Sequence, residues 1–387
     1  GNVAVGYRAM EVASGSAMVK NVAIGTNSQK NISHNNSAAN VSIGWGTLEG
    51  GAVTGEVKNN VAIGMGALAA ATTTYGNVAI GGRSALALLT SGNSMIAIGD
   101  GAGQSATTTT SCILIGSSAG NLLDGTGPNG SIAIGHSALA VHTTGGRNIA
   151  IGWEAMHDTN AGSTAQASND NTFIGYSAGG GTWANAESYG NVSLGNYTLD
   201  DSLNGAIYNT ALGYGALSDL ETGDGNVAVG TSAGQTTVDV DNTVLIGKQA
   251  GTGNLTSAAD GVIAIGFEAM KVHTTGARNM AIGYAAMNDT DAGSTSKGSS
   301  DNIFIGYDAG GGTWADAASN YNVGIGNYVM DGALNGAGYN TAVGYEALSA
   351  VTTADDIVAL GYRSLLSLTT GARNVGVGTS TGRSITV

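Results

Sequence analysis

The stretch Asn21-Val22-Ala23-Ile24-Gly25 decides the fold, because close copies of it recur from one end of the chain to the other. Identical copies occupy residues 60–64 and 77–81, and looser copies occupy residues 2–6, 148–152 and 226–230. Recurrence at a short period is the signature of a repeat architecture, in which each unit is stable only when it is stacked on its neighbours. Any function must therefore be argued from that architecture.

The glycine that closes each copy aligns the repeats, and there are 21 of them. From Gly116 to Gly247 successive closing glycines are 19, 17, 23, 20, 18, 17 and 17 residues apart, and the same seven spacings lead on to Gly378. The chain thus has a second period, a superrepeat of 131 residues. It divides into three seven-coil parts of one continuous solenoid: a degenerate part at 1–116, a second at 117–247, and a third with a C-terminal tail at 248–387.

The composition excludes several classes of protein. Charged residues make up only 10% of the 387 residues, against about 25% in ordinary globular domains. A single proline and no glycine period of three exclude collagen, and a patterned apolar content of 42% argues against disorder. The net charge of −14 comes without any basic stripe, so nucleic acid is not an expected partner. No run of 18 apolar residues occurs, so we expect no membrane insertion.

Each repeat begins with a strand pattern. Two β-branched or apolar residues alternate with alanine between an asparagine and a glycine, and an Ala-Leu or Ala-Met pair and a Thr/Ser/Gly turn follow. Glycine recurs too often for a helix, because each one costs about 1 kcal/mol in a helix interior. A unit of 17–23 residues cannot bury its own apolar face, but stacked units can. We predict an all-β fold, a parallel β-solenoid (β-roll) of about 21 coils and, at ~4.8 Å per coil, a rod on the order of 100 Å long.

The alanine row is the basis for predicting oligomers. We expect Val22 and Ile24 to point into the coil and Ala23 to point the opposite way, since side chains alternate along a strand. This third position is Ala, Ser or Gly in 17 of 21 repeats, which indicates burial against a close neighbour. Three chains around a common axis would bring the alanines together; alternatively, the row packs on a second wall of its own coil. The residues predicted to face the trimer axis are Ala23, Ala62, Ala79, Ala150 and Ala281.

The asparagine and the glycine of the repeated stretch have predicted structural roles. Asparagine opens 15 of the 21 repeats, and stacked coils would align these amides in a ladder that satisfies buried polar groups. Alternatively, asparagine is there because it tolerates a left-handed backbone at a turn. The closing glycine is expected at a corner that needs positive φ or close backbone approach.

At this point the sequence resembles known families. Units of Asn-x-Ala-Ile-Gly-x-x-Ala-Leu ending in Thr-Thr-Gly, from Asn2 to about Gly382, resemble repeats of phage and bacterial tail-fibre-type proteins. They are also similar to the head repeats of trimeric autotransporter adhesins. The resemblance implies a left-handed parallel β-roll that trimerises along a fibre axis and binds a cell surface. The coils here are longer than those of adhesin heads, so their loops are expected to project further.

Two long polar loops are the predicted recognition surface. They span 157–171 and 288–302, and each precedes a Gly-Gly-Gly-Thr-Trp sequence. Loops on a rigid scaffold are where binding residues usually lie, and an aromatic face can stack on a sugar ring. The candidate binding residues are Trp183, Tyr189, Trp314 and Tyr321. The alternative is that both tryptophans cover the glycine-rich corner of their own coils.

Other polar or reactive residues are given structural interpretations. Two acidic pairs could hold Ca²⁺ but lack a fixed ligand spacing, so solvated turns are preferred: Asp239 with Asp241, and Asp355 with Asp356. His142 and His273 could bind a metal around a threefold axis, but surface histidines in turns are the commoner case. Cys112 begins an apolar run and is expected to be a packed thiol. We therefore expect no metal and no cofactor, with Ca²⁺ as the open alternative.

The leading functional hypothesis is a non-enzymatic, homotrimeric fibre segment. It would be extracellular, at a cell surface or on a virion, with a rigid shaft that presents loops to a cell-surface receptor or glycan. One alternative is a polysaccharide depolymerase on a tailspike-like solenoid. Charged positions in and beside the long loops differ between superrepeats, with Gln166 against Lys297 and Asn185 against Asp316, which argues weakly against it. Another is a self-polymerising extracellular filament subunit, because both ends of the chain lie inside a repeat and could join end to end. Ice binding would need a regular threonine ladder, whereas the threonines cluster in turns.

Overall fold

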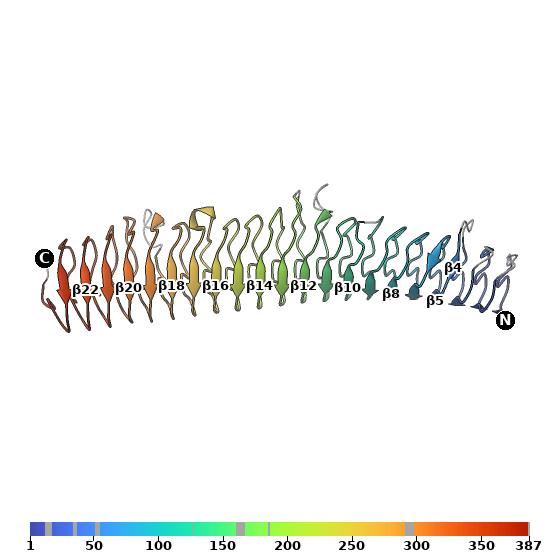
Figure 1. Ribbon diagram of the computed structural model, residues 1–387, viewed down its shortest axis with the longest axis horizontal. Helices are drawn as coiled ribbons and strands as arrows, with labels where there is room; N and C mark the ends of the chain where they lie inside the picture. The colour runs from blue at the N-terminus through green and yellow to red at the C-terminus, as the bar shows by residue number, and fades with distance from the viewer. Residues whose placement is uncertain are drawn as a thin grey trace. The chain divides into compact units, whose positions relative to one another are not determined.

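The chain folds as an all-β parallel β-solenoid with almost no helix. The computed structural model describes residues 1–11, 18–33, 37–50, 55–125, 127–159, 167–184, 186–290 and 298–385. They form two compact units: residues 1–196 with 202–205, and residues 197–201 with 206–387. Within each unit the strands lie side by side in chain order and point the same way (Figure 1).

Every copy of the repeated stretch forms one three-residue strand, which confirms the predicted repeat. In the first unit the strands are β1 (Val3–Val5), β2 (Val22–Ile24), β3 (Val41–Ile43), β5 (Val61–Ile63), β7 (Val78–Ile80), β8 (Ile96–Ile98), β9 (Ile113–Ile115), β10 (Ile132–Ile134), β11 (Ile149–Ile151), β12 (Thr172–Ile174) and β13 (Val192–Leu194). In the second unit they are β14 (Thr210–Leu212), β15 (Val227–Val229), β16 (Val244–Ile246), β17 (Ile263–Ile265), β18 (Met280–Ile282), β19 (Ile303–Ile305), β20 (Val323–Ile325), β21 (Thr341–Val343), β22 (Val358–Leu360) and β23 (Val375–Val377). The first unit also has a two-stranded sheet of β4 (Val57–Lys58) and β6 (Thr74–Tyr75), and the second has a short 3-10 helix, η2 (Ser257–Ala259).

Neighbouring strands pair in parallel without any shift in register. Val3 lies opposite Val22, and Ala4 lies opposite Ala23. The same in-register pairing joins β10 to β11 and β17 to β18. Equivalent residues of successive coils therefore form straight columns within each unit, and a property of one column position is repeated once per coil.

The closing glycines are needed because the coils approach each other there. Gly152 has a φ of +141°, a backbone conformation that residues with a side chain rarely adopt. A Cβ built on Gly152 would lie 2.1 Å from the carbonyl oxygen of Gly175, the closing glycine of the next coil. Both reasons predicted for a glycine at this corner, positive φ and close approach, are confirmed.

The predicted asparagine ladder is also confirmed. The backbone N–H and the side-chain Nδ2 of Asn171 both donate to Oδ1 of Asn148, at 3.0 and 3.2 Å. Oδ1 of Asn171 in turn accepts from the backbone N–H and the Nδ2 of Asn191, at 3.0 and 3.1 Å. The alternative of a left-handed asparagine is wrong, because the positive φ falls on the preceding residue, Asp170 (φ 57°), and not on Asn171.

The orientation predicted for the strand is wrong. Ala23 is fully buried within a single chain, whereas its neighbour Ile24 is 38% exposed. The same burial holds for the other residues that were expected to face a trimer axis: Ala62, Ala79, Ala150 and Ala281. The alternative interpretation, that the row packs inside its own coil, is correct.

The coil interior is narrow, which explains why the inward residue is small. At Ser42 the inward residue of the strand contacts both the third and the fourth residue after the closing glycine of the preceding coil, Ser28 and Gln29. In a polar version of this contact, Nε2 of Gln29 donates to Oγ of Ser42 at 3.0 Å. Where those turn residues are the usual Ala-Leu pair, as at Ala67 and Leu68, both are fully buried and leave room only for alanine opposite. Leu68 itself has a φ of +53°.

Four strands have a large inward residue in place of alanine, and at each of them a turn residue beside it is smaller in compensation. Leu245 stands where most strands have alanine, and the turns beside it have Gly234 and Gly251 in place of leucine. A Cβ added to Gly234 or Gly251 would lie 2.7 Å from a methyl group of Leu245. The same exchange places a large inward side chain beside glycine at the other three exceptions: Leu114, Phe173 and Phe304.

A double-mutant cycle tests this exchange. Leu245→Ala should lower the free energy of unfolding by about 3 kcal/mol, because it leaves a cavity. Gly251→Leu alone should lower it by about 2 kcal/mol through overcrowding. The double variant restores the alanine and leucine arrangement of the other coils, so it should be more stable than the sum of the two losses by at least about 1 kcal/mol. Additive losses in denaturant titrations would contradict the volume exchange.

Candidate functional site

The outward face of the sheet is the most unusual surface of the molecule. In every strand of this sheet after β1 the first and third residues flank a buried one and point outward, and at β13 these are Val192 and Leu194, which are 46% and 47% exposed. All 42 flanking positions (2 × 21 strands) hold Val, Ile, Leu, Met or Thr, and none holds a charge. A one-sided sheet normally turns polar residues to water. The sheet therefore carries continuous apolar columns on its outward side, a pattern that is uncommon on a protein surface exposed to water.

A column of aromatic rings runs along the corner that follows the sheet in the second unit. Phe267 stacks on Tyr284 and Tyr284 on Tyr307, with ring centroids 5.0 and 5.1 Å apart. Tyr345 and Tyr362 stack in the same way at 5.7 Å. These ring contacts join successive coils, although the tyrosines stay partly exposed, with Tyr284 at 49%.

Two of the predicted binding residues are not at the surface. Trp183 and Trp314 are both fully buried. The indole of Trp183 lies 5.7 Å from the ring of Phe173, and its Nε1 donates to the carbonyl oxygen of Gly179 at 3.1 Å. Trp314 makes the equivalent bond to Gly310 at 3.0 Å. The prediction of exposed tryptophans is wrong, since the rings close the glycine-rich corner of their coils, as the alternative held.

The two predicted tyrosines lie in different settings. Tyr189 is half-buried, whereas Tyr321 is 50% exposed and stacks on Tyr339 with centroids 5.0 Å apart. Sequence reasoning missed Tyr339. The available signal was its position directly before a ladder asparagine, Asn340, which matches the place of Tyr321 before Asn322.

The long loops are only partly within the described residues, which exclude 160–166 and 291–297. At the described base of the first loop, Oδ2 of Asp158 accepts a hydrogen bond from Oγ1 of Thr182 at 2.8 Å. Asp289 and Thr313 form the equivalent bond at 2.6 Å in the next superrepeat. The loop bases are therefore built alike in both copies.

The predicted surface histidines are buried. His142 is fully buried: Nε2 donates to the carbonyl oxygen of Gly145 at 2.7 Å, and Nδ1 lies 2.8 Å from Oγ1 of Thr159, which fixes the Nε2–H tautomer. His273 is held in the same way by Gly276 and Thr290. Burial lowers the pKa of His142 to about 4, because an imidazolium would lose its hydration inside the coil.

The other candidates for chemistry are held in structural roles. The predicted packed thiol is confirmed, since Cys112 is buried and burial raises its pKa to about 11. Among the acidic pairs, Asp239 accepts from the N–H of Ser257 and Asp241 from that of Asp224, at 3.0 and 2.7 Å. Within the described part of the chain, no three His, Cys, Asp or Glu side chains are grouped as metal ligands would be.

Two carboxyl groups at equivalent superrepeat positions have raised pKa values. Burial raises the pKa of Asp200 to about 6, with a smaller contribution from Asp219. Burial likewise raises the pKa of Asp331 to about 6, with a smaller contribution from Asp308. Asp200 lines a groove of about 270 Å³ together with Tyr197, Tyr214 and Asp219.

Comparison with known proteins adds no further constraint. No protein-family model and no curated protein matches the chain. None of the described helical segments is long and apolar enough to cross a membrane.

The burial of His142 generates a prediction about acid stability. Unfolding lets its pKa return from about 4 to about 6.5, so the unfolded chain binds more protons between these values. The contribution of His142 to stability should therefore be fully present above pH 6.5 and be lost as the pH drops towards 4, by up to roughly 3 kcal/mol, while the raised pKa values of Asp200 and Asp331 act in the opposite direction. His142→Gln should flatten that part of the curve of melting temperature against pH. Parallel curves for the two proteins would contradict this assignment.

Proposed function

We propose that the chain is a segment of a homotrimeric fibre, extracellular or carried on a virion, that presents surface side chains to a cell-surface glycan. The observation that carries the proposal is the uncharged apolar face along the strands. Each half-exposed Val or Ile on it would gain about 1 kcal/mol if another chain covered it. In-register pairing repeats this gain once per coil within each unit, so association would strengthen with every coil.

The two outward columns of each strand favour a closed ring of like chains. The first-position column, with residues such as Val192, and the third-position column, with residues such as Leu194, lie on opposite sides of the buried row. Around a threefold axis, the first-position column of each chain would contact the third-position column of the next chain. Such a contact between two different surfaces is heterologous, and three of them close into a ring. The proposed trimer contact is therefore made by the residues that flank the alanines and not by the alanines themselves. The resemblance of the repeats to trimeric adhesin heads supports an assembly of three chains.

Sedimentation of the whole chain tests the proposal. We expect a particle of about 114 kDa, three times the 38.0 kDa chain. Val192→Lys combined with Leu194→Lys should weaken the trimer, because six buried charges per trimer would need solvation. The circular dichroism spectrum should stay unchanged, since both residues point away from the coil interior.

The control for this experiment is Leu88→Lys, which places one lysine charge on an exposed leucine outside the strands. It should leave the trimer intact. A monomeric unaltered chain, or equal effects of the two changes, would refute association through the sheet face.

A second candidate function is a polysaccharide depolymerase, which the groove beside Asp200 favours. A carboxyl with a pKa near 6 can serve as a general acid, and Asp331 repeats it one superrepeat later. Under the fibre proposal, incubation with capsular polysaccharides should release no reducing ends. Chain cleavage that Asp200→Asn and Asp331→Asn abolish together would favour the enzyme instead.

A further inference from the structure

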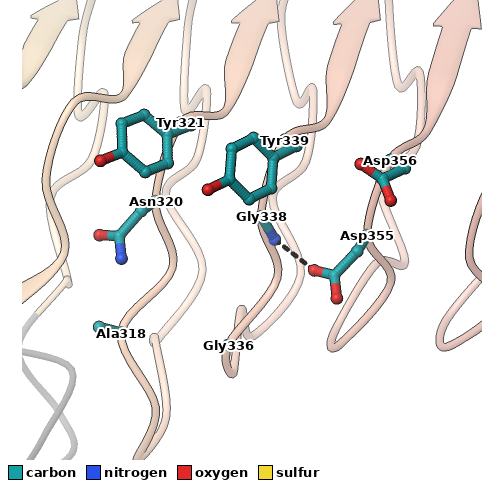
Figure 2. Close-up of a pocket in the computed structure, with 8 residues that line it drawn as sticks. All are labelled: Ala318, Asn320, Tyr321, Gly336, Gly338, Tyr339, Asp355 and Asp356. Carbon is teal, nitrogen blue, oxygen red and sulfur yellow. Dashed lines mark hydrogen bonds between the residues drawn. The ribbon is translucent and has the colours of Figure 1, made fainter.

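A groove of about 320 Å³ opens on the second unit beside Tyr321 and Tyr339 (Figure 2). It crosses three successive coils, those that lead into β20, β21 and β22. Its lining residues are Ala318, Asn320, Tyr321, Gly336, Gly338, Tyr339, Asp355 and Asp356.

The backbone holds both tyrosines outward. Each directly precedes a ladder asparagine and has a left-handed conformation, with φ of 60° at Tyr321 and 59° at Tyr339. The N–H of Tyr339 donates to the carbonyl oxygen of Asn320 at 3.2 Å. The side chain of Tyr339 is nevertheless 64% exposed, so a rigid backbone presents a largely free ring. Such pre-organisation reduces the entropy cost of binding.

The stack of the two rings leaves a defined face for a ligand. Tyr321 and Tyr339 are nearly parallel, with an interplanar angle of 16°, so their inner faces cover each other. In the next coil the equivalent position holds Asp356, whose φ of 59° matches that of Tyr339. Figure 2 shows this carboxylate beyond the ring of Tyr339, with no aromatic side chain between them. One face of Tyr339 therefore looks toward a carboxylate.

The rest of the groove supplies hydrogen-bonding groups and space. Asp355 accepts from the N–H of Gly338 at 2.7 Å through Oδ1, which fixes the carboxylate beside the groove. Asn320 accepts from the N–H of Ser300 at 2.7 Å, which orients its amide in the same way. Gly336 and Gly338 add no side chains, so the floor of the groove stays open.

We propose that this groove binds a neutral saccharide, with one sugar ring stacked on the outer face of Tyr339 and sugar hydroxyls donating to the carboxylates of Asp355 and Asp356. An aromatic face offers apolar contact to the C–H groups of a pyranose, and a carboxylate accepts strong charge-assisted hydrogen bonds from hydroxyls. Two carboxylates on a chain of net charge −14 disfavour uronic or sialic acids. This inference rests on the proposed function and assigns its glycan contact to particular residues.

The preceding superrepeat contains an incomplete copy of the groove. Tyr208 takes the place of Tyr339, and Asp224 accepts from the N–H of Ile207 at 2.9 Å, as Asp355 does from Gly338. Glycine takes the place of Tyr321, at position 190, and of Asp356, at position 225. The copy therefore lacks counterparts of Tyr321 and of the second carboxylate, Asp356, and Tyr208 is a matched control for Tyr339 in the same unit.

Calorimetric titration of the whole chain with neutral hexasaccharides of glucose, galactose, mannose and N-acetylglucosamine tests the assignment. At least one should bind, and tri-galacturonate should not compete. Tyr339→Ala should weaken binding by about tenfold or more, the loss expected when one stacking contact is removed. Tyr339→Phe keeps the ring and should retain most of the affinity, while Tyr208→Ala should have no effect.

Three results would overturn the assignment: no binding of any of the four hexasaccharides, equal affinity of Tyr339→Ala and the unaltered chain, or stronger binding of tri-galacturonate. Trimer formation and attachment to cells are measured separately. If trimers of Tyr339→Ala attach to cells as well as the unaltered protein does, the groove is not the contact, while the fibre proposal stands. If the unaltered chain is monomeric yet binds a hexasaccharide through Tyr339, the fibre proposal fails and the groove stands.

Discussion

The close approach of successive coils at their closing glycines is the constraint on which the structure depends. At Gly152 a single methyl group would collide with the carbonyl oxygen of Gly175. Because no side chain separates the coils there, the strands can pair in register, and the asparagines lie close enough to bond directly to one another. The ladder then satisfies polar groups that the narrow interior buries. Glycine at the corner and asparagine before the strand are thus two parts of one stacking solution.

The narrow interior imposes a second rule, a fixed volume shared between strand and turn. Alanine on the strand faces leucine or methionine on the turn, and leucine or phenylalanine on the strand faces glycine. The tryptophans extend the same rule, since Trp183 packs against Phe173 where the turn has glycine. With the interior filled in this way, the larger β-branched residues remain outside, and that gives the molecule its apolar face.

The sequence was sufficient to predict the architecture but not the direction of the side chains. Spacing located the strand, the corner glycine and the ladder asparagine of each repeat, because each has a local chemical reason, but it did not locate the small sheet of β4 and β6. Direction failed because all three residues of strands such as Val22–Ile24 are apolar, so no polar alternation marks the solvent side. The small size of Ala23 was attributed to a neighbouring chain, whereas its cause is a turn residue of the same chain. The directions of the Trp183 and Tyr339 side chains also depend on the folded structure. Trp183 lies inside the coil because a glycine leaves space for its ring. Tyr339 points outward because its backbone is left-handed.

The in-register stacking of coils within each unit, together with the 131-residue period of the sequence, has a consequence for how the length of such a chain can vary. Within each unit, neighbouring strands of successive coils pair with one another, and coils 131 residues apart have similar sequences. Inserting or deleting one whole superrepeat would leave the order of coil types unchanged. The new junction would join coils that already fit, with the same glycine corner and the same amide bond. Length in this architecture is therefore open to heritable variation in steps of seven coils, without a search for new packing at each step.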